Sequence, residues 1–226
     1  ISLDHTAYLG TTLTEIAQAK AGIIKPAGRV VSCGTSPEAD RIFQQTCRER
    51  NAEWTAVNYA RLQSQQSDLT GNIFDFQPQE GLYLPLLGTY QLQNAATAIT
   101  ALEVLQKRGW NITRRDIRRG LERVRWPGRL ELLRKFPVFL LDGAHNPQGI
   151  AATADSLHQI CPEQKWVFLL GVLRDKDVSS MLLNLLPLAK AFVTVTPDNP
   201  RAMDAETLRQ KLLPLGLPVS ACGSAE

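Results

Sequence analysis

The sequence predicts an α/β fold made of two consecutive domains. Short apolar segments of strand length alternate along the chain with segments whose apolar residues recur at helical spacing. Capping residues open several of the helical segments, and glycines close some of them. The alternation breaks at Trp126-Pro127-Gly128-Arg129, and a fresh series starts at Val138. We therefore place a domain boundary near Phe136, with predicted domains at 1–135 and 136–226.

The first domain begins with a pattern typical of a parallel sheet with helical crossovers. Thr12 and Glu15 form a potential capping box, and Ser36 followed by Pro37 is a strong helix start. Thr113 can cap a later helix, with Asp116 helping at its first turn. Helical spacing disappears between 63 and 85, which we interpret as a polar stretch and a β-hairpin forming an exposed excursion from the sheet. The expected helices are 12–21, 36–50, 91–108 and 114–123, and the expected strands are 29–33, 54–57, 72–76 and 82–86.

The second domain repeats the strand and helix alternation three times. Its expected strands are 138–141, 166–171 and 191–196, and its expected helices are 147–161, 178–186 and 205–213. This series stops at Glu226 without a final strand and helix, and Ile1 to His5 reads as the end of a buried strand. We therefore expect a piece of a longer protein, truncated at both ends.

Composition excludes several classes of protein. The formal net charge is only +3, and the cluster at Arg114, Arg115, Arg118 and Arg119 is typical of a solvated helix face rather than of a nucleic-acid site. The four cysteines are too far apart to indicate a disulfide framework or a zinc site. No apolar run approaches the roughly 18 residues of a membrane span. We expect a cytoplasmic protein with no nucleic-acid or membrane partner.

The segment from Asp142 to Pro147 is the first candidate site. It follows an apolar strand and precedes a helix, where ligands often bind in open α/β sheets. It presents an acceptor carboxylate (Asp142), an imidazole (His145) and an amide (Asn146) together. A tight turn in which Asn146 only caps the helix explains the same residues equally well.

Other candidates are weaker on their own. His5 follows a strand end, and Lys20 stands at a helix terminus; a lone histidine is more often a core residue, and a lone helical lysine is usually solvated. Asn94 presents an amide near a helix start, where polar ligands gather, although a surface role is as plausible. The chain contains no G-x-x-x-x-G-K-[ST] and no Gly-Lys dipeptide. The sequence by itself therefore does not indicate a nucleotide hydrolase.

Taken in order, five segments resemble the folylpolyglutamate synthase and dihydrofolate synthase family, which belongs with the Mur ligases. The family patterns are L-D-H, then L-G-x-T-L with I-A-x-x-K-A-G-I, Q-x-x-N-A, W-P-G-R-x-E and D-G-A-H-N-P. The matching segments of this sequence are Leu3-Asp4-His5, Leu9 to Ile23, Gln91 to Ala96, Trp126 to Glu131, and Asp142 to Pro147.

The resemblance implies the C-terminal part of a P-loop-type central domain followed by a Rossmann-like C-terminal α/β domain. In the family ATP binds in the cleft between the two domains. The phosphate-binding loop, an acidic Mg²⁺ ligand and the main pteridine-binding loops precede the position that corresponds to Ile1. One departure is Tyr90, where many relatives have histidine.

The resemblance also implies roles for individual residues on the metal side of the site. His5 corresponds to a Mg²⁺ ligand, and Lys20 corresponds to a lysine that is carbamylated. Carbamylation converts a cationic amine into a carboxylate-like oxygen donor, which suits a hard cation. The implied cofactors are ATP and Mg²⁺, with K⁺ as a further candidate cation.

On the nucleotide side, Asn94 and Asp142 correspond to residues that contact the adenosine part of ATP. Arg129 corresponds to a residue that reaches the phosphates. His145 is expected near the same site as a candidate catalytic residue, without a defined role.

The implied reaction is ATP-dependent addition of L-glutamate to dihydropteroate or to the glutamate tail of a folate, through an acyl phosphate. We expect a monomer, and we expect the 226 residues alone to be inactive because they lack the phosphate loop. Two alternatives remain open. One is a cell-wall Mur ligase, although those typically carry D-Y-A-H-N-P; the other is a non-catalytic nucleotide-binding module.

Overall fold

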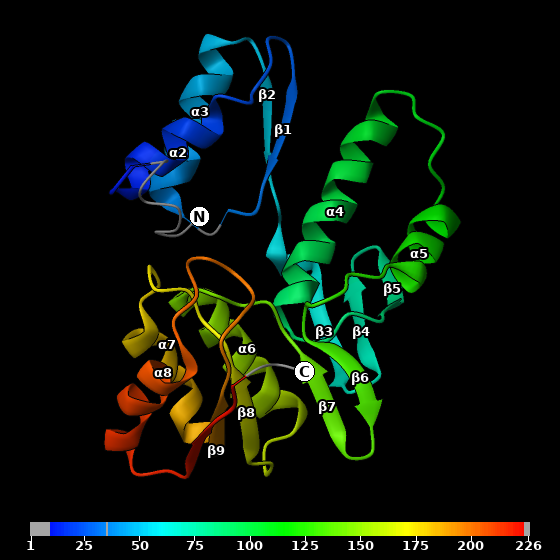
Figure 1. Ribbon diagram of the computed structural model, residues 1–226. Helices are drawn as coiled ribbons and strands as arrows, with labels where there is room; N and C mark the ends of the chain where they lie inside the picture. The colour runs from blue at the N-terminus through cyan, green and yellow to red at the C-terminus, as the bar shows by residue number, and fades with distance from the viewer. Residues whose placement is uncertain (1–9, 35, 224–226) are drawn as a thin grey trace. The chain divides into compact units, whose positions relative to one another are not determined.

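The computed structural model describes residues 10–34 and 36–223 (Figure 1). The chain divides into two compact units, one ending at Trp126 and the other beginning at Pro127. This division lies earlier than the predicted boundary near Phe136. The predicted position falls between β6 (Glu131–Lys135) and β7 (Val138–Leu141), which are antiparallel neighbours. A boundary there would cut a hairpin, so the W-P-G-R segment belongs mainly to the second unit.

The N-terminal unit begins as predicted, with two helices and two parallel strands. Their bounds are α2 (Leu13–Ala21), β1 (Arg29–Ser32), α3 (Pro37–Glu49) and β2 (Glu53–Ala56). The capping box at Thr12 and Glu15 is confirmed, because each side chain accepts a hydrogen bond from the backbone of the other residue. The predicted cap at Ser36 is also confirmed, since its hydroxyl accepts from the amide of Ala39.

The middle of this unit differs from the prediction. After a short 3₁₀ turn, Tyr59–Arg61, three antiparallel strands form a sheet in the order β3-β4-β5: β3 (Leu62–Asp68), β4 (Gly71–Phe76) and β5 (Gln79–Leu84). The expectation of an exposed excursion is wrong, because Phe74, Phe76 and Leu82 are completely buried. The polar stretch is the edge strand β3. Its glutamines and serines are largely exposed, so it lacks the apolar alternation by which a strand is recognised.

Two helices complete the N-terminal unit. In α4 (Tyr90–Lys107) the buried apolar residues pack in one core with Phe74, Phe76 and Leu82 of the sheet; they are Leu92, Ala95, Ala96 and Ile99. In α5 (Arg114–Arg123) the predicted capping box between Thr113 and Asp116 is present. Three arginines of the basic cluster are exposed, and the fourth, Arg118, donates to the backbone carbonyls of Glu80 and Gly81.

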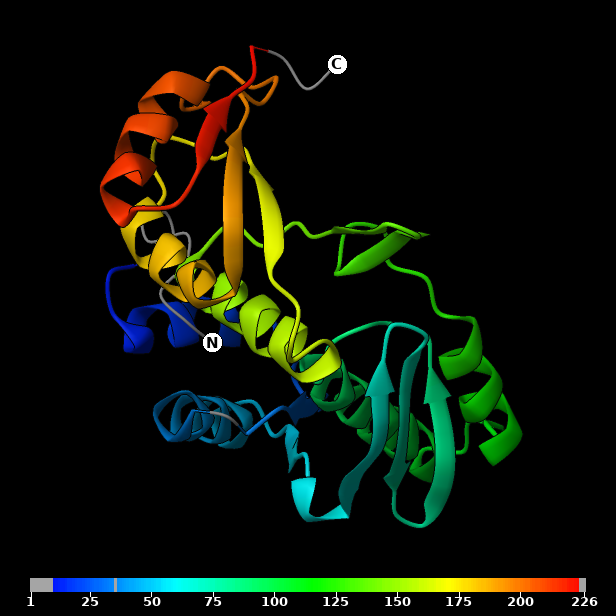
Figure 2. The same cartoon turned by 90° about the horizontal axis from the view of Figure 1, so that it is seen from below.

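The C-terminal unit contains a parallel three-stranded sheet in the order β10-β9-β8, with α7 and α8 along one face (Figure 2). Its elements after β7 are α6 (Pro147–Ile160), β8 (Trp166–Leu170), α7 (Val178–Leu185), β9 (Ala189–Thr194), α8 (Ala205–Leu212) and β10 (Val219–Ala221), with 3₁₀ turns at Leu186–Leu188 and Leu213–Leu215. The expectation that no strand follows the last helix is wrong. With three residues between Pro218 and Cys222, β10 is too short for an alternation pattern to show.

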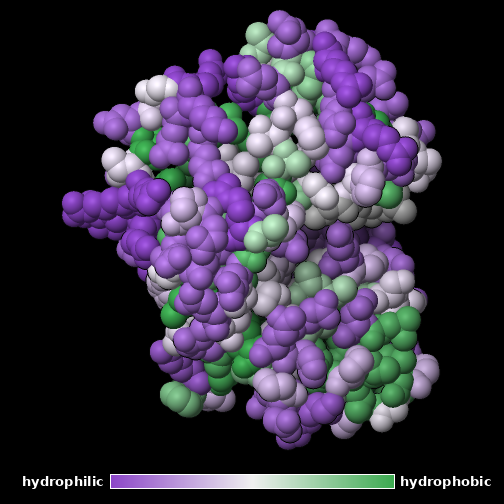
Figure 3. Space-filling model, turned by 180° about the vertical axis from the view of Figure 1, so that it is seen from behind, coloured by the Kyte–Doolittle hydropathy of each residue, from purple (hydrophilic) through white to green (hydrophobic). Residues whose placement is uncertain are grey.

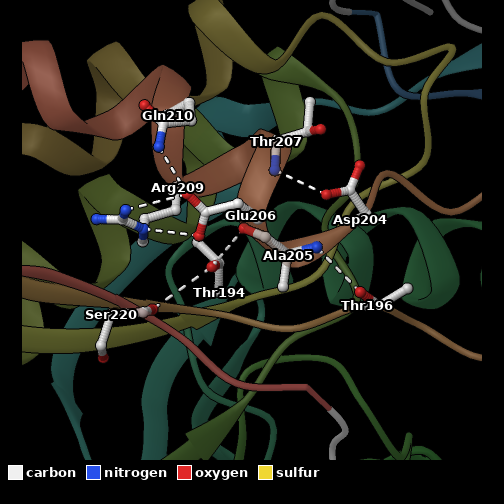
Figure 4. A network of polar contacts seen from close by, with 9 residues as sticks. All are labelled: Thr194, Thr196, Asp204, Ala205, Glu206, Thr207, Arg209, Gln210 and Ser220. Carbon is white, nitrogen blue, oxygen red and sulfur yellow. Dashed lines mark hydrogen bonds and ion pairs between the residues drawn. The ribbon is translucent and has the colours of Figure 1, made fainter.

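The connection between β9 and α8 is held by polar contacts (Figure 4). Thr194 is fully buried, and its hydroxyl donates to the carbonyl of Ala205 at 2.8 Å. Asp204 caps α8 by accepting from the amide of Thr207 at 2.8 Å. The bond from Thr194 attaches the start of α8 to β9, and the cap at Asp204 satisfies an amide in the first turn of the helix.

The surface is mixed in character. Apolar side chains gather over part of the C-terminal unit (Figure 3), and Leu183 of α7 is 65% exposed. Val167 and Leu169 of β8 are also more than half exposed. Among the described residues, no helix has both the length and the apolar character that crossing a membrane requires.

Stability of the N-terminal unit should depend on the pair between Arg61 and Glu103. Two hydrogen bonds of 2.6 and 2.8 Å join them, both side chains are about three-quarters buried, and the pairing raises the pKa of Arg61. The guanidinium also lies 4.1 Å from the ring centroid of Phe76. Glu103→Ala would leave this cation without its carboxylate. We expect the free energy of unfolding, measured by urea denaturation, to fall by about 1–3 kcal/mol.

A matched control is Glu206→Ala, which removes the carboxylate of the more exposed Arg209 to Glu206 pair. Solvent screens that pair, so we expect a smaller loss. Equal losses from the two substitutions would contradict the importance of the Arg61 pair.

The cap of α5 should make stability depend on pH. The hydroxyl and the amide of Thr113 donate to Asp116 and lower its pKa. A carboxyl with a lowered pKa in the folded state stabilises the fold above the unfolded value, about 4, and this contribution is lost as the pH falls through the folded value. In denaturation experiments between about pH 5 and 2, wild-type stability should fall more steeply than that of Asp116→Asn. Parallel curves would show that the cap carries no such linkage.

Candidate functional site

The predicted loop at 142–147 is tied to the turn that precedes β6 through one carboxylate. Asp142 Oδ2 accepts a hydrogen bond from the Leu130 amide at 2.7 Å. Asp142 Oδ1 accepts from the Ala144 amide at 2.8 Å and from the Thr153 hydroxyl at 3.0 Å. The three donors come from the turn, from the loop itself and from α6. Asp142 therefore joins three segments of the C-terminal unit.

A second link joins the backbone of the loop at 142–147 to the backbone of the turn that precedes β6. The Gly143 amide donates to the Gly128 carbonyl at 2.8 Å, and the Gly128 amide donates to the carboxylate of Glu131 at 2.8 Å. A Cβ atom at Gly143 would lie 3.2 Å from the Gly128 oxygen, which is closer than most real Cβ contacts. The two predicted motifs, W-P-G-R-x-E and D-G-A-H-N-P, thus form one hydrogen-bonded substructure.

This substructure presents Arg129 on a constrained turn. Gly128 has a φ of 69° and Leu130 a φ of 46°, both in the left-handed region. Leucine rarely adopts that conformation, which costs about 1–2 kcal/mol. Leu130 is 1% exposed, so its burial and the bond from its amide to Asp142 hold the conformation. Arg129, between the two, is exposed. Its guanidinium can form paired hydrogen bonds with a phosphate group.

The remainder of the loop starts α6. Asn146 caps the helix by accepting from the Gly149 amide at 2.7 Å, as the turn interpretation predicted. His145 is exposed, and its Nδ1 lies 2.9 Å from the Gly143 carbonyl oxygen. β7 pairs with β6 and not, among the described strands, with the parallel sheet. The loop at 142–147 is therefore positioned by its hydrogen bonds to the turn before β6, and not by following a strand of the parallel sheet.

Asn94 lies on the other unit, near the start of α4. It is exposed, and its Nδ2 donates to the side-chain oxygen of the buried Gln91 at 2.9 Å. The loop that precedes α4 is anchored by Asn72, which is completely buried. Asn72 donates to the Leu86 carbonyl at 2.6 Å and accepts from the Ser67 hydroxyl at 2.6 Å. An asparagine within a buried strand is the sequence signal that could have identified this anchor.

The structure gives little support for a metal site at the two residues predicted to hold one, His5 and Lys20. Lys20 is exposed in the last turn of α2, and His5 lies outside the described residues. Across 10–34 and 36–223, no group of three or more histidine, cysteine, aspartate or glutamate side chains could hold a metal ion. The roles of His5 and Lys20 stay predictions.

The structure thus brings Arg129, Asp142 and His145 into one substructure, and it places Asn94 and Lys20 in the N-terminal unit. Sequence reasoning missed Glu131 and Thr153 as supports of this site. A signal for Thr153 exists, because it is a polar residue on the face of α6 that also carries the buried Ile150 and Leu157.

Comparison with known proteins gives consistent matches. Residues 128–226 match the family model described as Mur ligase, glutamate ligase domain. A dihydrofolate synthase/folylpolyglutamate synthase of Bacillus subtilis is 35% identical over 214 residues, which are 92% of this chain and 50% of the relative.

Solved structures agree with this relationship. The Mycobacterium tuberculosis folylpolyglutamate synthase complexed with ADP matches with a TM-score of 0.86 at 30% identity, over 99% of this chain and 52% of that one. The Escherichia coli FolC in complex with DHPP and ADP matches with a TM-score of 0.79 at 27% identity, over 99% and 51%.

The chain therefore spans about half the length of the relatives that it matches. The predicted mixed α/β fold is confirmed by these structures. The resemblance noted from the five sequence segments is confirmed as well. The chain is a homologue of the folylpolyglutamate and dihydrofolate synthases, and its residues 128–226 match the Mur ligase, glutamate ligase domain.

Proposed function

We propose that this chain carries part of an ATP-dependent ligase that adds L-glutamate to dihydropteroate or to tetrahydrofolate polyglutamates. The observation that carries the proposal is the substructure in which Asp142 ties its own loop to the turn bearing Arg129. It joins two of the five segments that resemble the family. The homology to dihydrofolate and folylpolyglutamate synthases supports the choice of substrates.

The reaction transfers the γ-phosphoryl group of ATP to a substrate carboxylate, which gives an acyl phosphate and ADP. The α-amine of L-glutamate then attacks the activated carbonyl, an amide bond forms, and phosphate leaves. Such transfer depends on positioning and on neutralising phosphate charge. In this proposal Arg129 contacts the phosphates, and Asn94 and Asp142 contact the adenosine. The exposed guanidinium of Arg129 on a constrained turn supports its role.

The carboxylate of Asp142 limits how it could contact adenosine. A carboxylate offers about four acceptor positions. Three are occupied by Leu130, Ala144 and Thr153. One position on Oδ2 remains for a hydroxyl or amine of the nucleotide. Asp142 would therefore join segments of the protein by hydrogen bonds and also offer one acceptor position to the ligand.

The metal side stays a separate part of the proposal. A lysine amine becomes an oxygen donor only after carbamylation, and its exposed position would allow Lys20 to react with carbon dioxide. His5 would be the second donor. A bound Mg²⁺ would neutralise phosphate charge, and the described residues offer no further cluster of ligands for it.

The same proposal includes the expectations that the protein is a monomer, that it lies in the cytoplasm and that it acts on small molecules. No disulfide joins any of the four cysteines, all of which lie in described parts of the chain. A chain without a disulfide framework is usual in a reducing compartment, which supports the cytoplasm in this proposal.

Two other functions have an observation in their favour. The family model matched by 128–226 covers Mur ligases in general, which supports a cell-wall Mur ligase. The 226 residues contain no Gly-Lys dipeptide, which supports a nucleotide-binding module without catalysis of its own. Substrate turnover and nucleotide binding separate these possibilities.

The nucleotide residues can be tested by ATP binding to the 226-residue chain, measured by isothermal titration calorimetry. We expect weak binding that Arg129→Ala reduces about tenfold or more, because hydrogen bonds to charged groups are worth about 1.5–3 kcal/mol. Asn94→Ala should weaken ATP and adenosine alike, whereas Arg129→Ala should affect ATP more. The matched control is Arg134→Ala, an exposed arginine of β6 outside the predicted site. Micromolar binding that Arg129→Ala and Asp142→Ala leave unchanged would show that these residues are wrongly assigned.

Substrate choice can be tested in a chimaera in which this chain replaces the 214 matched residues of the Bacillus subtilis relative. We expect ATP-dependent addition of glutamate to dihydropteroate or to tetrahydrofolate, followed by mass spectrometry of the product. The 226 residues alone should give no product. Turnover only with UDP-muramoyl substrates would favour the cell-wall ligase, and product from the 226 residues alone would contradict the expectation of inactivity.

A further inference from the structure

Thr153 lies on the buried face of α6 and is 7% exposed. Its hydroxyl oxygen lies 3.0 Å from Asp142 Oδ1 and 3.1 Å from the Gly149 carbonyl oxygen of its own helix. A threonine hydroxyl carries one proton, and a charged carboxylate is a stronger acceptor than a neutral carbonyl. The hydroxyl is therefore placed to donate chiefly to Asp142.

This donation determines the orientation of the carboxylate. Oδ1 of Asp142 has two acceptor positions, and the Ala144 amide and the Thr153 hydroxyl occupy them. With Oδ1 held by two donors from different segments, the plane of the carboxylate is fixed. Oδ2 is then directed at the Leu130 amide, 2.7 Å away.

The effect reaches Arg129 through Leu130. Leu130 keeps an unfavourable left-handed conformation, with a φ of 46°, while its amide is bound by Asp142. A looser carboxylate would weaken that bond and let the turn relax toward an extended conformation. The direction of the neighbouring Arg129 side chain would then be less well defined, and ordering it on ligand binding would cost more conformational entropy.

We propose that Thr153 is a positioning residue for nucleotide binding, which acts through Asp142 on the turn that carries Arg129. The proposal rests on the proposed function, because it takes ATP as the ligand. Thr153 itself need not touch the nucleotide. Its hydroxyl orients the carboxylate, and the carboxylate in turn holds the Leu130 amide beside Arg129.

A purely structural role of the hydroxyl has a close counterpart elsewhere in the chain. Thr100 in α4 is 5% exposed, and its hydroxyl donates to the Ala96 carbonyl of its own helix at 2.8 Å. Thr100→Val and Thr153→Val therefore remove the same atoms from similarly buried helical positions. Only the second substitution takes a donor away from Asp142.

The experiment compares Thr153→Val, Thr153→Ser and Thr100→Val with the wild-type 226-residue chain. Two quantities are measured: the Kd for ATP by calorimetry, and the hydrogen exchange rate of the Leu130 amide by NMR. We expect Thr153→Val to raise the Kd about three- to tenfold and to speed exchange at Leu130 by a similar factor. Thr153→Ser, which keeps the hydroxyl, should behave nearly as wild type, and Thr100→Val should change neither quantity.

The outcomes separate this proposal from the proposed function. If wild type binds ATP and Thr153→Val changes neither the Kd nor exchange at Leu130, the positioning role is overturned while the function stands. The same holds if Thr100→Val produces equal changes, because the effect is then a general loss of stability. If wild type does not bind ATP at all, the proposed function fails, and the positioning role in nucleotide binding fails with it.

Discussion

The carboxylate of Asp142 is the interaction on which the candidate site depends. It accepts hydrogen bonds from the Leu130 amide, the Ala144 amide and the Thr153 hydroxyl, all between 2.7 and 3.0 Å. Leaving a partly buried donor unpaired costs about 1–3 kcal/mol, so the bonds are stabilising chiefly because their absence would be unfavourable. Without them the turn at Gly128 to Leu130 would have little to hold its left-handed conformations.

This constraint makes the strand-to-helix turn at 142–147 suitable for the proposed nucleotide site. The interpretation of residues 142–147 as a turn capped by Asn146 is confirmed. The same bonds present Arg129 from a neighbouring segment on a rigid support. Backbone strain at Leu130 fits this view, because sparsely populated conformations gather at functional sites where the surroundings enforce them. The structural and the functional interpretations of the loop are therefore compatible.

Much of the fold could be predicted from local signals in the sequence. The caps at Thr12, Ser36, Thr113 and Asn146 were predicted because each depends on residues within three positions of one another. The errors concern segments whose structure depends on distant partners. β3 is polar because it is an edge strand, and β10 is a strand because it pairs with β9.

In the candidate site, too, local sequence signals were predicted and contacts with distant partners were not. Arg129 and Asp142 were predicted because whole segments resemble a family, not because their spacing reveals that they are linked. Thr153 and Asn72 were missed, since a buried hydroxyl or amide gains a role only when the fold supplies its partner. The role of Lys20 could be predicted by resemblance alone, and nothing around it in α2 marks it as reactive.

The central claim is that Asp142 fixes the turn bearing Arg129 before any ligand binds. A crystal structure of the 226-residue chain without nucleotide tests it most directly. The claim predicts Asp142 Oδ2 within hydrogen-bond distance of the Leu130 amide, with Leu130 in the left-handed region. A carboxylate turned to solvent, with Leu130 in an extended conformation, would contradict it.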